Sequence, residues 1–307
     1  MISSIFGKTK PINFFILCGV LLVLYIGMPV FEGNYHFYEH QTGAIILTSI
    51  VLVLTILVLD FIVKRNKITE SNSYAILFYV LFCIAFPESV ASSKFVFCNF
   101  FLVLATRRLV SLKSLNDIRL KLYDATIWIV IASLFVDWAA LYIVLVFLSI
   151  LIYEPQIAKN WLVPITGIAT VGFIGFAYLK WNQNEALIND HFQFSIQESD
   201  FSIQQWMLFG ISLLIIVVSV FVTFSQASKT VVGKNNTLRL VAASLVIGLL
   251  AAGFSKENSM SSVLFVFFPA TIFLTNATEL IRKPKAKEIA LLIMIIAPFV
   301  LLVYRLI

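Results

Sequence analysis

Two long apolar stretches of this chain, residues 75–106 and 123–153, each carry an acidic residue near the midpoint. A bilayer core of about 30 Å needs about 20 apolar residues in each helix that crosses it. Each stretch is therefore too long for one crossing and short for two. A hairpin with arms of about 12 to 15 residues would turn inside the membrane, which places Glu88 and Asp137 below its surface.

The composition is that of a multispan membrane protein. Apolar residues make up 60% of the sequence, charged residues make up 12%, and the mean hydropathy is +0.97, whereas soluble domains contain about 25% charged residues. The net charge of +6 does not indicate nucleic-acid binding, because basic residues of membrane proteins usually set the topology. The three cysteines lie in apolar runs, and their odd number argues against a complete disulfide framework.

The basic residues predict the topology. Eighteen of the 22 Lys and Arg residues fall into six clusters, which the positive-inside rule places in the cytoplasm. The clusters are Lys8 and Lys10; Lys64, Arg65 and Lys67; Arg107, Arg108, Lys113, Arg119 and Lys121; Lys159; Lys229, Lys234 and Arg239; and Arg282, Lys283, Lys285 and Lys287. Both long stretches must then be hairpins, because a single crossing in either would move later clusters to the outer side.

The sequence therefore predicts an all-α fold, a polytopic transmembrane bundle of about 11 helices. We expect residues 1–307 to form a single domain, without a separate soluble one, with the N-terminus inside and the C-terminus outside. Helices 3–4 and 5–6 form the two short hairpins, and residues 107–121 form a short helix on the inner surface. The predicted crossings cover about residues 12–31, 43–63, 74–88, 94–106, 122–137, 139–154, 162–180, 206–225, 239–254, 262–278 and 288–305.

Short hairpins among full-length helices predict a cavity that opens to the outside. An arm of about 13 residues rises roughly 20 Å, so its tip stops about 10 Å short of the far boundary. The cavity floor would carry Glu88, Lys94, Asp137 and Trp138, and ionisable groups at membrane depth favour a functional site. A structural role is the alternative. Glu88 and Lys94 could pair to close their own turn, and Asp137 could cap the helix that follows it.

The first predicted outer loop contains a metal-binding pattern. His36, Glu39 and His40 match the H-x-x-E-H sequence of inverted zinc peptidases, in which two histidines on one helix face hold zinc and the glutamate activates water. The loop is too short to supply a distant third ligand, which Glu88 or Asp137 could provide. An interfacial polar loop with aromatic anchors is the alternative that the composition favours. We therefore expect no cofactor and keep these three residues as candidate metal ligands.

Several segments carry a resemblance to a known family. The opening MISSIFGKTKPIN, the segment RRLVSLKS at residues 107–114, and KLYDAT and ASLF, which begin at Lys121 and Ala132, resemble an uncharacterised family of multispan proteins from Bacteroidota. This resemblance runs along the whole chain and implies the bacterial inner (cytoplasmic) membrane, without an activity. The hairpins around an outward cavity are also similar to membrane glycosyltransferases and polysaccharide polymerases that use polyprenyl-phosphate sugars, in architecture only.

Three functions fit these features, and the sequence leaves open whether the protein is an enzyme. The first is a transferase of envelope glycan biosynthesis, with Asp137 or Glu88 as general base and Lys94 or Lys256 holding the substrate phosphate. The second is a transporter or lipid flippase that uses the same acids for ion coupling. The third is a noncatalytic scaffold of an envelope assembly. The expected partners are membrane lipids, a lipid-linked glycan and other membrane proteins, and nucleic acid is not expected.

Overall fold

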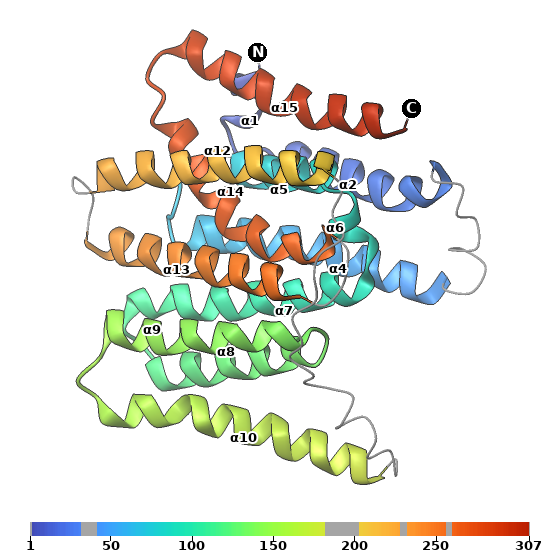
Figure 1. Cartoon of the computed structure of the whole chain (residues 1–307). Coiled ribbons are helices and arrows are strands. Elements are labelled where there is room, and N and C mark those ends of the chain that lie inside the picture. The colour runs from blue at the N-terminus through green and yellow to red at the C-terminus, as the bar shows by residue number, and fades with distance from the viewer. Residues whose placement is uncertain (1, 32–41, 182–202, 228–231, 256–259, 307) are drawn as a thin grey trace.

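All regular structure in the described part of the chain is helical, and the helices lie side by side along one general direction (Figure 1). The computed structural model describes residues 2–31, 42–181, 203–227, 232–255 and 260–306. The α-helices are α1 (Ile2–Phe6), α2 (Pro11–Phe31), α4 (Thr42–Arg65), α5 (Tyr74–Ala85), α6 (Glu88–Ala91), α7 (Ser93–Val110), α8 (Ile118–Ser133), α9 (Ile143–Tyr153), α10 (Ala158–Trp181), α12 (Ile203–Ala227), α13 (Val232–Phe254), α14 (Leu264–Glu279) and α15 (Pro284–Leu306). Short 3-10 helices are η1 (Ser111–Ser114), η2 (Asp137–Tyr142) and η3 (Met260–Val263). The predicted all-α fold is confirmed.

Six helical segments within the described residues are long and apolar enough to cross a membrane. They are Gly43–Arg65, Ser93–Ser114, Ala158–Trp181, Ile203–Gln226, Gly233–Phe254 and Met260–Glu279. Shorter apolar helices lie at Pro11–Gly27, Tyr74–Ala85 and Asp137–Tyr153. The chain therefore has the features of a helical membrane protein with six candidate crossings, and the predicted total of about 11 and its orientation stay predictions.

Each of the two long apolar stretches is divided into two helices by a turn. In the first, α5 ends at Ala85 and the short helix α6 precedes α7; in the second, α8 ends at Ser133 and η2 precedes α9. Glu88 is the first residue of α6, and Asp137 is the first residue of η2. Both midpoint acids therefore begin the short helix that follows the turn of their stretch.

The predicted surface helix over residues 107–121 is wrong. Residues up to Val110 continue α7, and Leu115 and Asp117 then adopt left-handed backbone conformations with φ of 54° and 51°. A left-handed residue cannot continue a right-handed helix. A new helix, α8, begins at Ile118, four residues before the predicted crossing.

The core of the bundle surrounds α14. In its apolar segment 94% of the residues are buried, against 17% in α10 and in α12. A helix that is apolar on every side belongs in the interior, and α14 packs against α5, α12 and α13. Its Phe267 ring stacks on Phe82 of α5 at 5.2 Å and meets Tyr79 edge-on at 6.1 Å. Aromatic packing therefore joins α5 to the central helix.

Several of the predicted basic clusters meet at one end of the bundle. The Lys113 ammonium group donates a hydrogen bond to the backbone oxygen of Asn66 at 3.0 Å, and the same side chain lies beside Gly233. The ammonium nitrogen of Lys287 lies 5.2 Å from the centre of the Tyr74 ring. The first contacts join η1 to the residue that follows α4 and to the start of α13, and the last joins the start of α15 to the start of α5. We call this end of the bundle the basic end.

Gly248 lets α13 approach η2 and α14 closely. A methyl group added there would lie 2.8 Å from the Tyr142 hydroxyl and 2.9 Å from the backbone oxygen of Phe265. We expect Gly248→Ala to lower stability by about 1–3 kcal/mol, because overpacking displaces neighbours. Gly253→Ala is the matched control in the same helix, since nothing lies within 4 Å of the added group. Thermal unfolding in detergent measures both, and equal melting temperatures would contradict the prediction.

Candidate functional site

The turn at Glu88 joins three segments that are distant in the sequence. Both carboxylate oxygens of Glu88 accept hydrogen bonds from the side-chain amide of Gln205 in α12, at 3.0 and 3.1 Å. The backbone oxygen of Glu88 accepts a hydrogen bond from the Ser261 hydroxyl of η3 at 3.0 Å. We call Glu88, Ser89, Gln205 and Ser261 the Glu88 cluster.

Local sequence explains why the chain turns here. Phe86 closes α5 by donating its backbone N–H to the backbone oxygen of Phe82 at 2.9 Å. Pro87, which has no N–H to continue the helix, directly precedes α6. Glu88 then lies in the first turn of α6, where a negative charge is favoured by the exposed amide groups.

Ser89 adds a buried polar atom to the cluster. Its side chain is fully buried, and its hydroxyl has no hydrogen-bond partner among the described residues. Leaving a buried hydroxyl unpaired costs about 1–3 kcal/mol, so such groups are uncommon in native structures. We regard Ser89 as a candidate contact for a polar ligand group.

The other residues predicted for the cavity floor lie in α7 and η2. Lys94 is exposed in the first turn of α7. Asp137 is half-buried at the start of η2, and the adjoining Trp138 ring lies 4.9 Å from the Phe254 ring at the end of α13. The residue before η2 is Val136, which makes no side-chain cap. A single cavity floor formed jointly by Glu88, Lys94, Asp137 and Trp138 stays a prediction.

Four of the predicted site residues lie outside the described residues. These are His36, Glu39 and His40 of the H-x-x-E-H pattern, and Lys256. Within the described ranges, no group of three or more His, Cys, Asp and Glu side chains is placed to hold a metal ion. The metal hypothesis therefore stays a prediction for the first loop.

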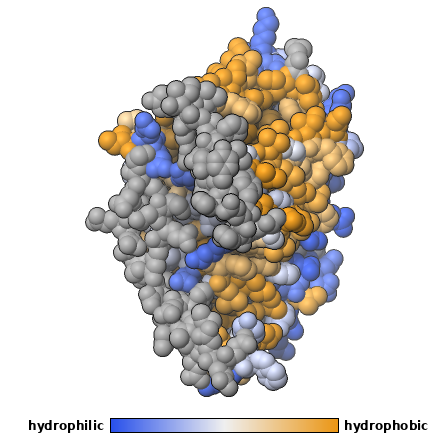
Figure 2. Space-filling model, turned by 90° about the vertical axis from the view of Figure 1, so that its right-hand side faces the viewer, coloured by the Kyte–Doolittle hydropathy of each residue, from blue (hydrophilic) through white to orange (hydrophobic). Residues whose placement is uncertain are grey.

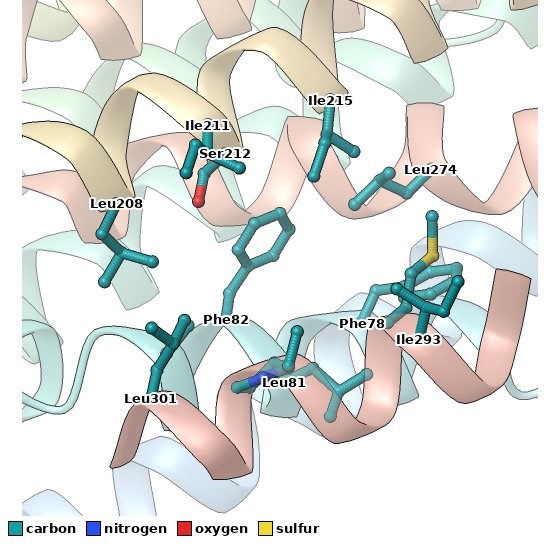
Figure 3. Close-up of a pocket in the computed structure, with 14 residues that line it drawn as sticks. Phe78, Leu81, Phe82, Leu208, Ile211, Ser212, Ile215, Leu274, Ile293 and Leu301 are labelled. Atoms are coloured by element: carbon teal, nitrogen blue, oxygen red, sulfur yellow. The ribbon is translucent and has the colours of Figure 1, made fainter. Parts of the chain in front are cut away.

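A groove with apolar walls lies between α5, α12, α14 and α15 (Figure 3). It encloses about 150 Å³, the Phe82 ring projects into it, and Ser212 of α12 directs its hydroxyl toward that ring. Ile211 and Ile293 line its mouth and are 62% and 59% exposed. The groove therefore opens on the side of the bundle. Seen from the end where α2 ends and α4 begins, the bundle carries a broad hydrophobic surface on its flank (Figure 2).

The groove extends toward the Glu88 cluster. A small void of about 10 Å³ shares Phe82 and Ser212 with the groove and reaches Phe86 and Val263. Phe86 precedes Glu88 by two residues, and Val263 follows Ser261 by two. On the opposite wall, Leu208 lies one helical turn after Gln205. An apolar groove whose lining residues are sequence neighbours of a polar cluster suits an amphiphile with a hydrocarbon chain and a polar head.

Sequence reasoning missed Gln205, Ser261, Ser89 and Ser212. It placed Gln205 at the end of an outer loop, and no spacing relates residues 88, 205 and 261. The polar pair Gln204-Gln205 at the start of an apolar run was the only available signal, and the fold alone shows that one of the two meets Glu88.

The fold is that of a helical bundle with six candidate membrane crossings, and it carries an apolar groove between α5, α12, α14 and α15. The chain belongs to DUF6427, a family of unknown function whose model matches residues 4–307. The predicted resemblance to an uncharacterised family is thereby confirmed, while its host and membrane stay predictions. Neither the curated proteins nor the solved structures that were compared with the chain match it.

We expect the contact between Glu88 and Gln205 to stabilise the packing of α12. Glu88→Leu and Gln205→Leu should each lower the melting temperature, and the double variant should fall little further. A hydrogen bond to a charged, half-buried group predicts a coupling of about 1 kcal/mol in this double-mutant cycle. Gln204→Leu, at the exposed neighbour, is the control. Fully additive losses would show that the two side chains do not act together.

Proposed function

We propose that the protein is a membrane transferase that acts on a lipid-linked substrate. The hydrocarbon chain of the substrate lies in the groove between α5, α12, α14 and α15, and its polar head lies at the Glu88 cluster. The observation that supports this proposal is that the void beside the groove reaches Phe86 and Val263, each two residues from a member of the Glu88 cluster. The proposed location is a bacterial inner membrane.

The groove favours a single flexible hydrocarbon chain. Its walls come from four helices, and the Ser212 hydroxyl is directed into it (Figure 3). Ligand sites of this kind combine an apolar lining with a few placed polar groups. Because the exposed apolar residues Ile211 and Ile293 line its mouth, a lipid can enter from the bilayer without crossing water. A polyprenyl-phosphate sugar has both the chain and the polar head that this arrangement suits.

Glu88 is the proposed general base. Its carboxylate takes the proton from a hydroxyl group of the acceptor, and the acceptor oxygen forms a bond to the anomeric carbon of the sugar. The bond between that carbon and the phosphate oxygen breaks, and polyprenyl phosphate leaves with the electron pair. Gln205 orients the carboxylate through its two hydrogen bonds. Lys94 and Lys256 are proposed to neutralise the phosphate, and Asp137 is the alternative base.

A lipid flippase is the second candidate, because the groove opens sideways to the bilayer at Ile211 and Ile293. In that case a lipid moves along the same groove and no covalent bond changes. Glu88 or Asp137 would then couple the movement to protons or cations. The scaffold hypothesis stays a prediction without a specific contact in its support.

Blocking the groove tests lipid binding. We expect Ser212→Trp to fill the space beside Phe82 and to abolish photo-crosslinking of the protein by a polyprenyl phosphate probe. Val217→Trp places the same ring on the outer face of α12, where Val217 is exposed, and should crosslink as the parent does. Both variants are first shown to keep the parent melting temperature. Equal crosslinking of the two variants would show that the lipid binds elsewhere.

Removing the proposed base tests the chemistry. We expect Glu88→Gln to keep the probe crosslink while sugar transfer from polyprenyl-phosphate sugar falls by about 10²- to 10⁴-fold, the usual contribution of a general base. Full transfer activity in a Glu88→Gln, Asp137→Asn double variant would show that neither residue is the general base. Lipid movement across proteoliposomes without any transfer by the parent would favour the flippase.

A further inference from the structure

A second groove lies at the basic end of the bundle, between α4 and α7. It is a shallow, open groove of about 670 Å³, lined by apolar and charged side chains together, including Leu57, Phe61, Lys64, Arg65 and Arg107. It lies at the other end of α4 and α7 from the Glu88 turn and shares no lining residue with the groove between α5, α12, α14 and α15. It therefore belongs to a different site.

Positive charge exceeds negative charge in this groove. Asp60 is its acidic lining residue, and its carboxylate pairs with the Lys64 ammonium group at 2.5 Å. Arg65 and Arg107 form no ion pair with any described residue. The groove thus presents two guanidinium groups that carry no local counter-charge, which favours an anion.

Arg107 is held in a defined position. Its guanidinium carbon lies 4.5 Å from the centre of the Phe61 ring, one helical turn before Arg65 on α4. A guanidinium group stacked on an aromatic face keeps its N–H groups directed to the sides, where they can donate two parallel hydrogen bonds to a phosphate. The Phe61 ring therefore restrains the position of the Arg107 guanidinium group.

The apolar part of the groove is exposed on the outer side of the bundle. Leu57 and Phe61 are 44% and 45% exposed and lie on α4, whose candidate membrane segment ends at Arg65. The guanidinium groups therefore lie where a membrane helix ends, and apolar side chains lie directly beside them. An anion with attached hydrocarbon chains matches both parts, whereas a free phosphate matches only the charged part.

We propose that this groove binds an anionic phospholipid, with its phosphate between Arg65 and Arg107 and its acyl chains along Leu57 and Phe61. Basic pockets between transmembrane helices recognise acidic headgroups through this combination of charge and apolar contact. The bound lipid would join α4 to α7 at the basic end. This site is independent of the transferase proposal.

Native mass spectrometry of the full-length protein in detergent tests the site. After delipidation the protein is titrated with phosphatidylglycerol and with phosphatidylcholine of identical acyl chains. We expect the first to bind at least several-fold more tightly. Arg107→Gln should weaken phosphatidylglycerol binding about 5-fold, from about 1 kcal/mol for each basic residue at a membrane surface. Lys283→Gln, an exposed basic residue outside the groove, should leave the affinity unchanged.

Three results would overturn the proposal. They are equal affinity for the two lipids, equal effects of Arg107→Gln and Lys283→Gln, and displacement of the lipid by millimolar inorganic phosphate, which would indicate a site for the free anion. Arg107→Lys keeps the charge and should lose less affinity than Arg107→Gln. If Arg107→Gln does not fold, Arg65→Gln is measured in its place, with the same expected loss and the same control.

Discussion

The packing of α14 against the helices around it is the interaction on which the rest of the structure depends. In a bilayer, lipid tails are as apolar as the side chains, so burial alone gives little reason for helices to associate, and close van der Waals packing provides much of the association. The buried rings of α14, with Phe267 stacked on Phe82, provide such packing. Because α5 is fixed against α14, the turn that follows α5 is also fixed, and Glu88 lies in that turn.

The charge pattern and helix lengths predicted the main divisions of the fold. Hairpins in residues 75–106 and 123–153 followed from the positive-inside rule, and the structure places a turn in each. The surface helix over residues 107–121 was not predicted correctly, because hydrophobic periodicity cannot reveal the left-handed backbone at Leu115 and Asp117. The apolar residues of this segment have the spacing of an amphipathic helix, but the left-handed backbone at these two residues interrupts the helix.

The candidate site was only partly predictable. Glu88 stood out because an acid is unusual inside an apolar run. Its partners did not, since Gln205 and Ser261 are common polar residues whose positions depend on how α12 and η3 pack. The groove could not be predicted from the sequence either, because its lining side chains have the same apolar character as residues that face lipid. A groove of this kind is the space that the side chains of neighbouring helices leave unfilled, so the sequence of one helix does not predict it.

Phe82 and Phe86 contact both the core and the space that leads from the groove. Each ring packs on Phe267 of the central helix, and each also lines the void near Glu88. A molecule that occupies this space would press against rings that hold α5 to α14, so occupancy and folding stability would be thermodynamically linked. Heat resistance would then vary with the identity of the lipid present. The natural ligand could be recognised by how strongly it protects the fold, before any reaction is known.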